Sequence, residues 1–184
     1  MVSYPMSKGG EKMQAVEFAV LDWIQAHLRC EFLDWLMPAV SALSNHGEVW
    51  ILLAVLLVLR KGRRREGLSV GAALVLDLLS CNLVLKPLVD RVRPCILNSA
   101  VELLVAVPAD ASFPSGHTAA SFAAVSALYF SGSPLWRPAA VLASLIAFSR
   151  LYLYVHWPTD VLGGILLGLA VGWLGAKLVK KVSP

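Results

Sequence analysis

The chain has 184 residues, of which 58% are hydrophobic and only 15% charged, and its mean hydropathy is +0.69. Soluble globular domains are nearer roughly 45–50% apolar and about 25% charged, so this composition excludes a disordered chain and argues against a soluble one. Three cysteines are too few for a disulfide-stapled framework. The length fits one domain, and the composition predicts a small integral membrane protein.

Basic residues gather in two clusters beside apolar segments, which explains the net charge of +4 without a nucleic-acid partner. Five of the sixteen lysines and arginines lie at 60–65, directly after the apolar run 49–59. Three lysines follow another apolar run close to the end of the chain. Charges that flank hydrophobic segments are typical of membrane proteins, so we expect no binding to nucleic acid.

Residues 1–45 are expected to form an N-terminal unit that precedes the catalytic core. Residues 1–12 are polar, and no cleavable signal peptide is apparent. The apolar residues that follow recur at steps of three and four: Phe18, Leu21, Ile24 and Leu28. This spacing predicts an amphipathic helix lying in the membrane interface. Residues 32–43 are predicted to form a short first span.

Further spans are predicted within residues 46–184, the expected transmembrane catalytic core. They cover residues 49–59, 68–85, 118–136, 138–155 and 161–176. The nineteen uncharged residues between His117 and Arg137 would make about 28 Å of helix, close to a hydrocarbon core of roughly 30 Å. The predicted fold is therefore an all-α bundle of about six transmembrane helices, in one domain overall.

The distribution of basic residues predicts how the bundle is oriented in the membrane. The run at 60–65, Arg137 and the lysine-rich C-terminus are predicted to share one side, which the positive-inside rule makes cytoplasmic. The loops 86–114 and 156–160 would then face the extracytoplasmic side. Three cations in the first of these loops are exceptions that need another explanation: Lys86, Arg91 and Arg93.

Three glycines in the last predicted span are spaced by four residues: Gly164, Gly168 and Gly172. Small residues at this spacing let helix backbones approach closely. We expect them to pack within one bundle, and a dimer interface is the alternative.

Three motifs lie at the extracytoplasmic ends of predicted spans. Their sequences are KPLVDRVRP at 86–94, PSGH at 114–117 and SRLYLYVHWPTD at 149–160. Each is short, but in this order and on one predicted side they form a specific combination. Cations and histidines at membrane depth are costly and indicate a functional site.

The cations of these motifs indicate an anion-binding site. Lys86, Arg93 and Arg150 would repel one another unless an anion joined them. Phosphate fits, because arginine offers a planar fork for bidentate contact and lysine a movable point charge. Ser115 and Gly116 would lie at the start of a helix, where unpaired N–H groups and the helix dipole favour the same phosphate oxygens.

In these motifs the chain resembles the type 2 phosphatidic acid phosphatase (PAP2) family of membrane lipid phosphatases, over about residues 67–180. The related vanadium haloperoxidases and glucose-6-phosphatases share the same pocket. The chain looks like the small bacterial members, since it has almost no soluble loops. The resemblance implies phosphate-ester or diphosphate hydrolysis through a phosphohistidine intermediate.

The residues alone leave open which histidine attacks, although Asp160 lies four residues after His156 and could orient it. The resemblance implies that His156 is the nucleophile, that Asp160 orients it and that His117 is the general acid and base. It also implies the residues that bind phosphate: Lys86, Arg93, Ser115, Gly116 and Arg150.

Some residues carry weaker predictions. No histidine cluster or pair of carboxylates resembles a metal site, so we expect catalysis without a metal or another cofactor. Asp77, inside a predicted span, is expected either to make a structural hydrogen bond or to act in catalysis. Asp90 and Arg91 are expected to pair with each other.

The expected substrate is a lipid phosphate that enters laterally from the membrane, with undecaprenyl diphosphate, a lipid carrier of the cell envelope, as the first candidate. The alternatives are phosphatidylglycerophosphate or phosphatidic acid phosphatase, lipid A phosphatase, and a phosphotransferase with an acceptor other than water. From another class, an anion-binding membrane transporter is the alternative. Hydrophobic spans argue against a haloperoxidase, although vanadate should still occupy the site as a phosphate mimic.

Overall fold

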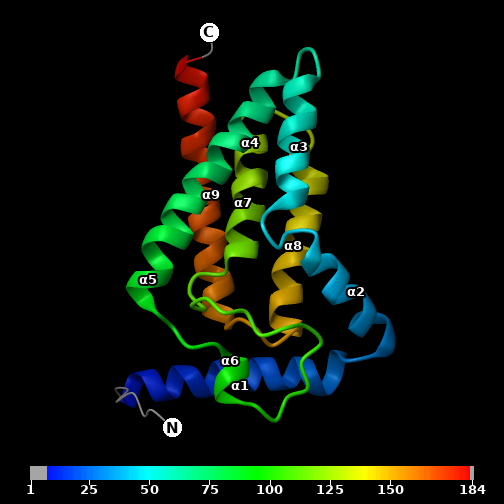
Figure 1. The fold of residues 1–184 in the computed structure, drawn as a ribbon, viewed down its shortest axis with the longest axis vertical. Coiled ribbons are helices and arrows are strands. Elements are labelled where there is room, and N and C mark those ends of the chain that lie inside the picture. Colours follow the sequence, from blue (N-terminus) through cyan, green and yellow to red (C-terminus); the bar gives the residue numbers. More distant parts are fainter. Residues whose placement is uncertain (1–7, 183–184) are drawn as a thin grey trace.

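A computed structural model describes residues 8–182, and it contains helices joined by loops (Figure 1). Its elements, in chain order, are α1 (Lys8–Leu28), α2 (Glu31–Ala42), α3 (Glu48–Leu59), α4 (Arg64–Asp77), the π-helical segment η1 (Leu78–Leu85), α5 (Lys86–Val89), α6 (Pro94–Leu97), α7 (Gly116–Phe130), α8 (Trp136–Tyr152) and α9 (Pro158–Val182). The described chain is thus all-α, as the composition predicts.

Helices α3, α4, α7, α8 and α9 lie side by side as a bundle, with α7 packed between α8 and α9 (Figure 1). Helix α1 lies across one end of this bundle, nearly perpendicular to it, and α2 slants from α1 towards α3. The loop that carries α6 crosses α1 in this view and then returns towards the end of the bundle.

Each predicted span is helical, but two boundaries differ from the prediction. Helix α7 ends at Phe130 rather than at 136, because Gly132 adopts a φ of +79° and reverses the chain. Helix α8 ends at Tyr152 rather than at 155, because Tyr154 has a φ of +59°, which a helix does not accommodate. Both turns shorten the helices.

The predicted spans differ in length, and most of the helices that contain them are shorter than a typical transmembrane helix. Two helical segments of the described chain are long and apolar enough to cross a membrane by themselves, Arg64–Leu97 and Pro158–Lys181. Glu48–Leu59 is a shorter apolar helix. The other predicted spans fall below the roughly 20 residues that a bilayer requires, because charges and turns end them early.

The glycines of α9 pack within the bundle, as predicted. A Cβ at Gly168 would lie 2.4 Å from the carbonyl oxygen of Ala119, and one at Gly172 would lie 2.4 Å from that of Ala123. Real Cβ atoms do not come this close, so the two backbones touch only because these residues lack side chains. Helix α9 is thereby held directly against α7, whose first residue belongs to the PSGH motif.

Helix α1 uses its predicted apolar stripe to bind the rest of the protein. Leu21 and Ile24 are buried, and the ring of Phe18 lies 4.7 Å from that of Trp157 in an edge-to-face contact. The exposed apolar residues of α1, which include Val16 and Trp23, lie on other faces, and the location of α1 in the membrane interface is still a prediction. The stripe packs against the loop before α9.

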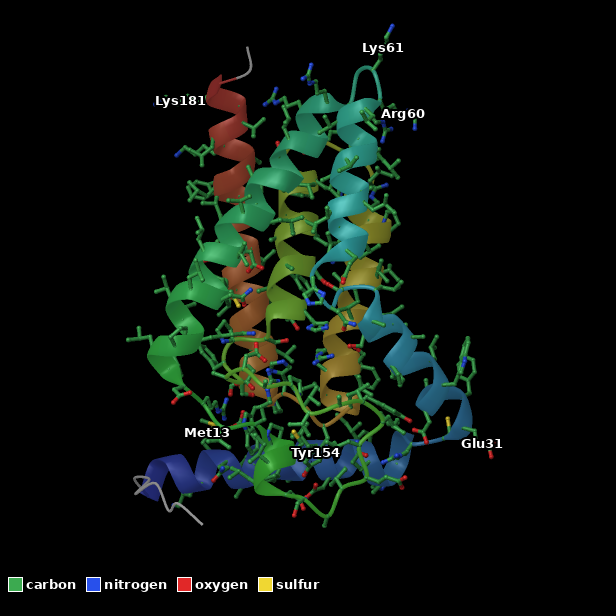
Figure 2. All side chains as sticks on the ribbon, in the orientation of Figure 1. Met13, Glu31, Arg60, Lys61, Tyr154 and Lys181 are labelled. Carbon is green, nitrogen blue, oxygen red and sulfur yellow. The ribbon has the colours of Figure 1, made fainter. Side chains whose placement is uncertain are left out.

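The basic clusters share one end of the bundle. Figure 2 shows Arg60, Lys61 and Lys181 at the end opposite to α1, while Tyr154 lies beside α1 at the other end. The motif residues at the ends of α8 and α9 therefore lie away from the basic clusters, as the prediction requires.

Candidate active site

A cavity of about 1660 Å³ brings together most of the residues that the motifs predict. It is lined by Lys86, Gly116, His117, Arg93, Arg150 and His156. Ser115 and Asp160 do not line it, and both are completely buried behind its wall. The three motifs, which lie between residues 86 and 160, thus converge on one site.

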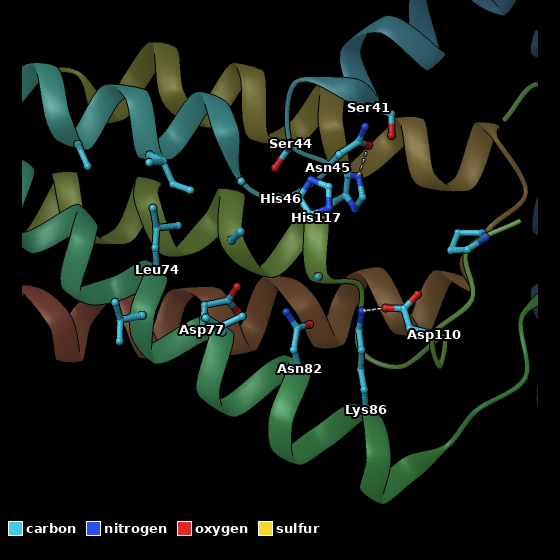
Figure 3. A pocket seen from close by; sticks show the side chains of 18 of the residues that line it. Ser41, Ser44, Asn45, His46, Leu74, Asp77, Asn82, Lys86, Asp110 and His117 are labelled. Atoms are coloured by element: carbon cyan, nitrogen blue, oxygen red, sulfur yellow. Dashed lines mark hydrogen bonds and ion pairs between the residues drawn. The ribbon is translucent and has the colours of Figure 1, made fainter. Parts of the chain in front are cut away.

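One wall of the cavity comes from the continuous helix α4–η1–α5. Figure 3 shows Asp77, Asn82 and Lys86 pointing from this helix into the cavity, opposite His117. Their steps of five and four residues suit the wider π-helical turn of η1, a feature that occurs frequently at functional sites. In the described part of the chain, Oδ1 of Asp77 has no hydrogen-bond partner, so no structural bond to a neighbouring helix is seen there.

The start of α7 forms the opposite wall. A Cβ on Gly116 would lie 3.5 Å from Lys86 Nζ and 3.6 Å from Asn82 Oδ1, so glycine leaves room here for a ligand oxygen. Ser115 occupies the N-cap position that was predicted, yet its N–H donates to the Asp160 carbonyl oxygen at 3.0 Å. Its hydroxyl accepts a hydrogen bond from Thr118 at 3.0 Å. Ser115 therefore joins the start of α7 to α9.

Arg93 is buried and connects the first motif to the third. Its Nη1 donates to the carbonyl oxygen of Val155 at 2.8 Å and lies 3.0 Å from Nε2 of His156. A guanidinium can only donate, so Nε2 of His156 must be the acceptor. The neutral imidazole then carries its proton on Nδ1, and the lone pair of Nε2 is on the side of the cations.

Asp160 lies on the other side of the same imidazole. Its Oδ2 is 3.4 Å from Nδ1 of His156, within ion-pair range but without a formed hydrogen bond. Burial and the nearby Arg93 and Arg150 cations lower the pKa of His156 to about 3, although Asp160 opposes this shift. The ring is therefore neutral at physiological pH, the form in which Nε2 is a nucleophile.

Arg150, near the end of α8, is the third cation of the site. It is 4% exposed, and its Nη1 donates to the hydroxyl of Ser41 on α2. Within the described residues, Nε of Arg150 has no hydrogen-bond partner. A buried donor in a cavity wall is costly without an acceptor, which indicates a ligand oxygen.

Asp110, which the motifs do not predict, pairs with two of the three cations of the site, Lys86 and Arg93. Its Oδ1 accepts from Arg93 Nη2 at 2.7 Å, and its Oδ2 forms an ion pair with Lys86 Nζ (Figure 3). Burial raises the pKa of Asp110, but the two cations outweigh burial and lower it to about 2. The residue lies in a loop without a motif, so no sequence pattern could have indicated this role.

His117 has a partner that was also not predicted. Its Nε2 lies 3.2 Å from Oδ1 of Asn45, in the loop between α2 and α3 (Figure 3). The N-terminal helices therefore contribute a residue to the cavity wall.

The prediction that Arg91 pairs with Asp90 is wrong. Arg91 Nη1 donates to Asp160 Oδ1 at 2.6 Å, and its Nη2 pairs with Glu17 on α1. Asp90 instead has a left-handed backbone at the end of α5, which turns Arg91 towards α9.

A comparison with known proteins identifies the family, since the sequence profile of the PAP2 superfamily matches residues 66–184. The chain belongs to the PAP2 superfamily. It is a membrane lipid phosphatase and hence a hydrolase. This assignment to the PAP2 enzymes replaces the transporter alternative.

Curated PAP2 relatives cover most of the chain. An undecaprenyl-diphosphatase of Sulfolobus acidocaldarius is 34% identical over 149 residues, which is 77% of this chain and 72% of the relative. A decaprenylphosphoryl-5-phosphoribose phosphatase of Mycobacterium tuberculosis is 36% identical over 143 residues, or 74% and 77% of the two chains.

A solved structure supports the same assignment. The transmembrane PAP2-type phosphatidylglycerolphosphate phosphatase of Bacillus subtilis superposes with a TM-score of 0.75 and 28% identity, over 94% of this chain and 88% of that one. Within residues 8–182, no group of three His, Cys, Asp or Glu side chains is placed to hold a metal ion. Metal-independent catalysis is still a prediction.

Proposed function

We propose that this PAP2 phosphatase hydrolyses a polyprenyl diphosphate, with undecaprenyl diphosphate as the first candidate. The supporting observation is that one cavity joins the cation cluster to an apolar groove between α3 and α4. Residues of the groove include Val55, Val58, Leu68, Leu74 and Val75. A diphosphate would bind at the polar end while a flexible hydrocarbon chain lies in the groove. Two of the relatives named above act on polyprenyl substrates by name.

In the proposed first step, the lipid phosphate binds to Lys86, Arg93 and Arg150, with Gly116 leaving space for one oxygen. Nε2 of His156 attacks phosphorus, a P–N bond forms, and the bond to the leaving oxygen breaks. His117 gives that oxygen a proton. The cations stabilise the charge that spreads over the equatorial oxygens in the transition state.

In the proposed second step, water hydrolyses the phosphohistidine. His117, now deprotonated, accepts a proton from the attacking water as the P–N bond breaks. Inorganic phosphate leaves and His156 returns to its neutral form. Asp160 stabilises the positive imidazole while phosphorus is attached to Nε2, which is the part that a third triad member plays.

We further propose that α2, α3, α4–α5, α7, α8 and α9 cross the membrane, with α1 at its surface. The bundle has its basic clusters at one end and its motifs towards the other. The positive-inside rule then puts the cavity on the extracytoplasmic side. Short helices such as α3 could still cross, since a bilayer thins locally around short spans.

Phosphatidylglycerophosphate is the second candidate substrate, because the Bacillus subtilis structure carries that activity in its name. Both lipids need the same phosphate site and differ in the tail and the leaving group. The shape of the apolar groove is the feature that would distinguish them.

The deciding experiment is phosphate release by the detergent-purified protein with a chelator present. Undecaprenyl diphosphate, phosphatidylglycerophosphate and phosphatidic acid are compared, with His156→Ala as the control. We expect the highest kcat/KM for undecaprenyl diphosphate and no release by the variant. A preference for phosphatidylglycerophosphate would assign the enzyme to phospholipid synthesis, and turnover by His156→Ala would exclude the phosphohistidine. Formation of a phosphorylated acceptor in place of inorganic phosphate, when glycerol or a sugar is added, would make it a phosphotransferase.

A further inference from the structure

Glu17 is a buried carboxylate next to the active site, although it lies on α1. It is 2% exposed, and its Oε2 pairs with Nη2 of Arg91. Nη1 of the same guanidinium donates to Oδ1 of Asp160 at 2.6 Å. Arg91 thus bridges two buried carboxylates, one from α1 and one from the first turn of α9. The family profile begins at residue 66, so Glu17 lies outside the part of the chain that it matches.

We propose that Glu17 and Arg91 are positioning residues that hold Asp160 against His156 and set the negative charge that Asp160 presents to it. This inference rests on the proposed role of His156 as nucleophile, and it does not depend on which lipid is the substrate. Neither residue touches the cavity, so both act through Asp160 rather than on the phosphate.

The first step of the argument is geometric. Oε1 of Glu17 accepts hydrogen bonds from the backbone N–H of Thr159 at 3.2 Å and from its hydroxyl at 2.5 Å. Thr159 directly precedes Asp160 in the first turn of α9, where backbone N–H groups lack helical partners. Glu17 therefore fixes the turn that carries Asp160, in the way that a capping residue would.

The second step concerns charge. Asp160 accepts hydrogen bonds from the hydroxyl of Ser112 and from the N–H of Trp157, the latter at 2.9 Å. Arg91 adds a full positive charge, which by itself would cancel the carboxylate. Because Glu17 also pairs with Arg91, the three ions together retain one net negative charge. That charge is what a developing imidazolium on His156 requires.

The third step concerns the surroundings of the guanidinium. The indole ring of Trp157 lies under Arg91, with 5.0 Å between the guanidinium carbon and the ring centroid. Glu17 and Asp160 are buried, and Arg91 is mostly covered. Ionic interactions that exclude water are stronger than surface pairs, and loss of one partner leaves an uncompensated charge. A neutral residue at position 17 would therefore change the position of Asp160 and the net charge around it, in addition to weakening the attachment of α1.

A purely structural role, in which Glu17 merely attaches α1, makes a different prediction. Loss of that attachment would reduce stability, anion binding and turnover together. A positioning role reduces the chemical step and leaves anion binding intact, because Lys86, Arg93 and Arg150 do not contact Glu17.

The test uses the full-length enzyme and whichever lipid the wild type hydrolyses. The variants are Glu17→Gln, Arg91→Met and the double variant, with Glu31→Gln and Arg64→Met as exposed controls of the same chemistry. Measured are kcat, KM, the vanadate inhibition constant and the midpoint of thermal unfolding. Glu17→Gln should lower kcat by about tenfold, a typical effect of residues that orient a ligand or base, with KM and vanadate inhibition within about twofold of the wild type.

Arg91→Met should lower kcat further, since it leaves Glu17 and Asp160 as two adjacent buried carboxylates. The double variant removes one charge of each sign, so its kcat should exceed that of Arg91→Met. If Glu17→Gln does not fold, Arg91→Lys replaces it: lysine keeps the charge but cannot bridge both carboxylates, and kcat should fall with vanadate binding preserved.

Two results would overturn the inference. One is a Glu17→Gln enzyme with the kcat of the wild type. The other is a parallel loss of kcat, vanadate binding and thermal stability, which would make Glu17 an attachment site only. Failure of the proposed nucleophile is seen separately, as turnover by His156→Ala.

Discussion

Nη2 of Arg93 donates to Oδ1 of Asp110 at 2.7 Å, and Nε of the same side chain donates to the carbonyl oxygen of Asp110 at 2.9 Å. Lys86 pairs with the other carboxylate oxygen. An internal carboxylate thus lies on two of the cations that we assign to the substrate phosphate. Asp110 is about half exposed, with its side chain 51% accessible, and its loop has no regular structure, so an incoming anion can displace it.

Asp110→Asn should therefore strengthen anion binding. The amide keeps the size of the side chain but removes the charge that competes with phosphate for Arg93 and Lys86. We expect vanadate to inhibit about tenfold more tightly, the equivalent of one charge-assisted hydrogen bond. The matched control is Glu102→Gln, an exposed acidic residue of the same loop that does not line the cavity. Weaker vanadate inhibition would instead mean that Asp110 orients the cations for phosphate.

A second prediction concerns the protonation of His156. Because burial and two cations lower its pKa to about 3, the ring should stay neutral as the pH falls from 8 to 5. Its proton should be on Nδ1, since Nε2 accepts from Arg93 at 3.0 Å. Nitrogen NMR of histidine-labelled, anion-free enzyme checks both points, with His156→Gln to assign the signals. Titration with a midpoint near 6.5, the ordinary histidine value, would contradict the prediction.

The same shift affects stability in a defined direction. A histidine whose pKa is lower in the folded state binds more protons when unfolded, so its contribution falls as the pH drops below about 6.5. The lowered pKa of Asp110 acts at more acidic pH: its contribution is lost between its ordinary value and about 2. The enzyme should therefore unfold more easily in acid.

A third prediction concerns Asn45 and its contact with His117. The amide oxygen holds Nε2 of His117 at 3.2 Å, which leaves Nδ1 for proton transfer. Asn45→Leu should lower kcat about tenfold with a small change in KM. This loss is a part of the rate acceleration that general acid catalysis by a positioned side chain supplies. With p-nitrophenyl phosphate, whose leaving group needs no proton, the loss should be much smaller. An equal loss with both substrates would show that Asn45 supports the fold rather than His117.

The motifs predicted the cation cluster because they contain the cations and histidines that phosphate chemistry requires. Each motif also lies at the end of a helix, and the bundle brings these ends together. Once the direction of each predicted span is known, the sequence groups five residues on one side of the membrane: Lys86, Arg93, Arg150, His117 and His156. Asp110, Asn45 and Glu17 were not predictable in this way. Each lies in a loop or helix outside the motifs, and its contact depends on how the chain folds back in three dimensions.

The helix positions were predicted better than their ends. Hydropathy locates apolar runs, but it does not register a single residue with a left-handed backbone. Gly132 lies in the SGS sequence after α7, a turn signal that could have moved the predicted end to Phe130. Tyr154 gives no such signal, because an aromatic residue rarely adopts a positive φ.

A fourth prediction tests the contact between α7 and α9. A Cβ at Gly168 would lie 2.4 Å from the Ala119 carbonyl oxygen and 2.8 Å from the Ala123 nitrogen. Both are backbone atoms, so Gly168→Ala must push the helices apart, at a cost of about 1–3 kcal/mol for an overpacked core. We expect a lower midpoint of thermal unfolding in detergent.

The matched control for this substitution is Gly71→Ala, also within a helix. A Cβ at Gly71 would meet no atom within 4 Å, so this variant should keep or raise the unfolding midpoint, since alanine favours helices. Because Gly164 in the same row faces Ser115 at the start of the PSGH motif, separation of the helices should also lower kcat in Gly168→Ala. Equal stability of the two variants would mean that α7 and α9 are less tightly packed than the backbone distances indicate.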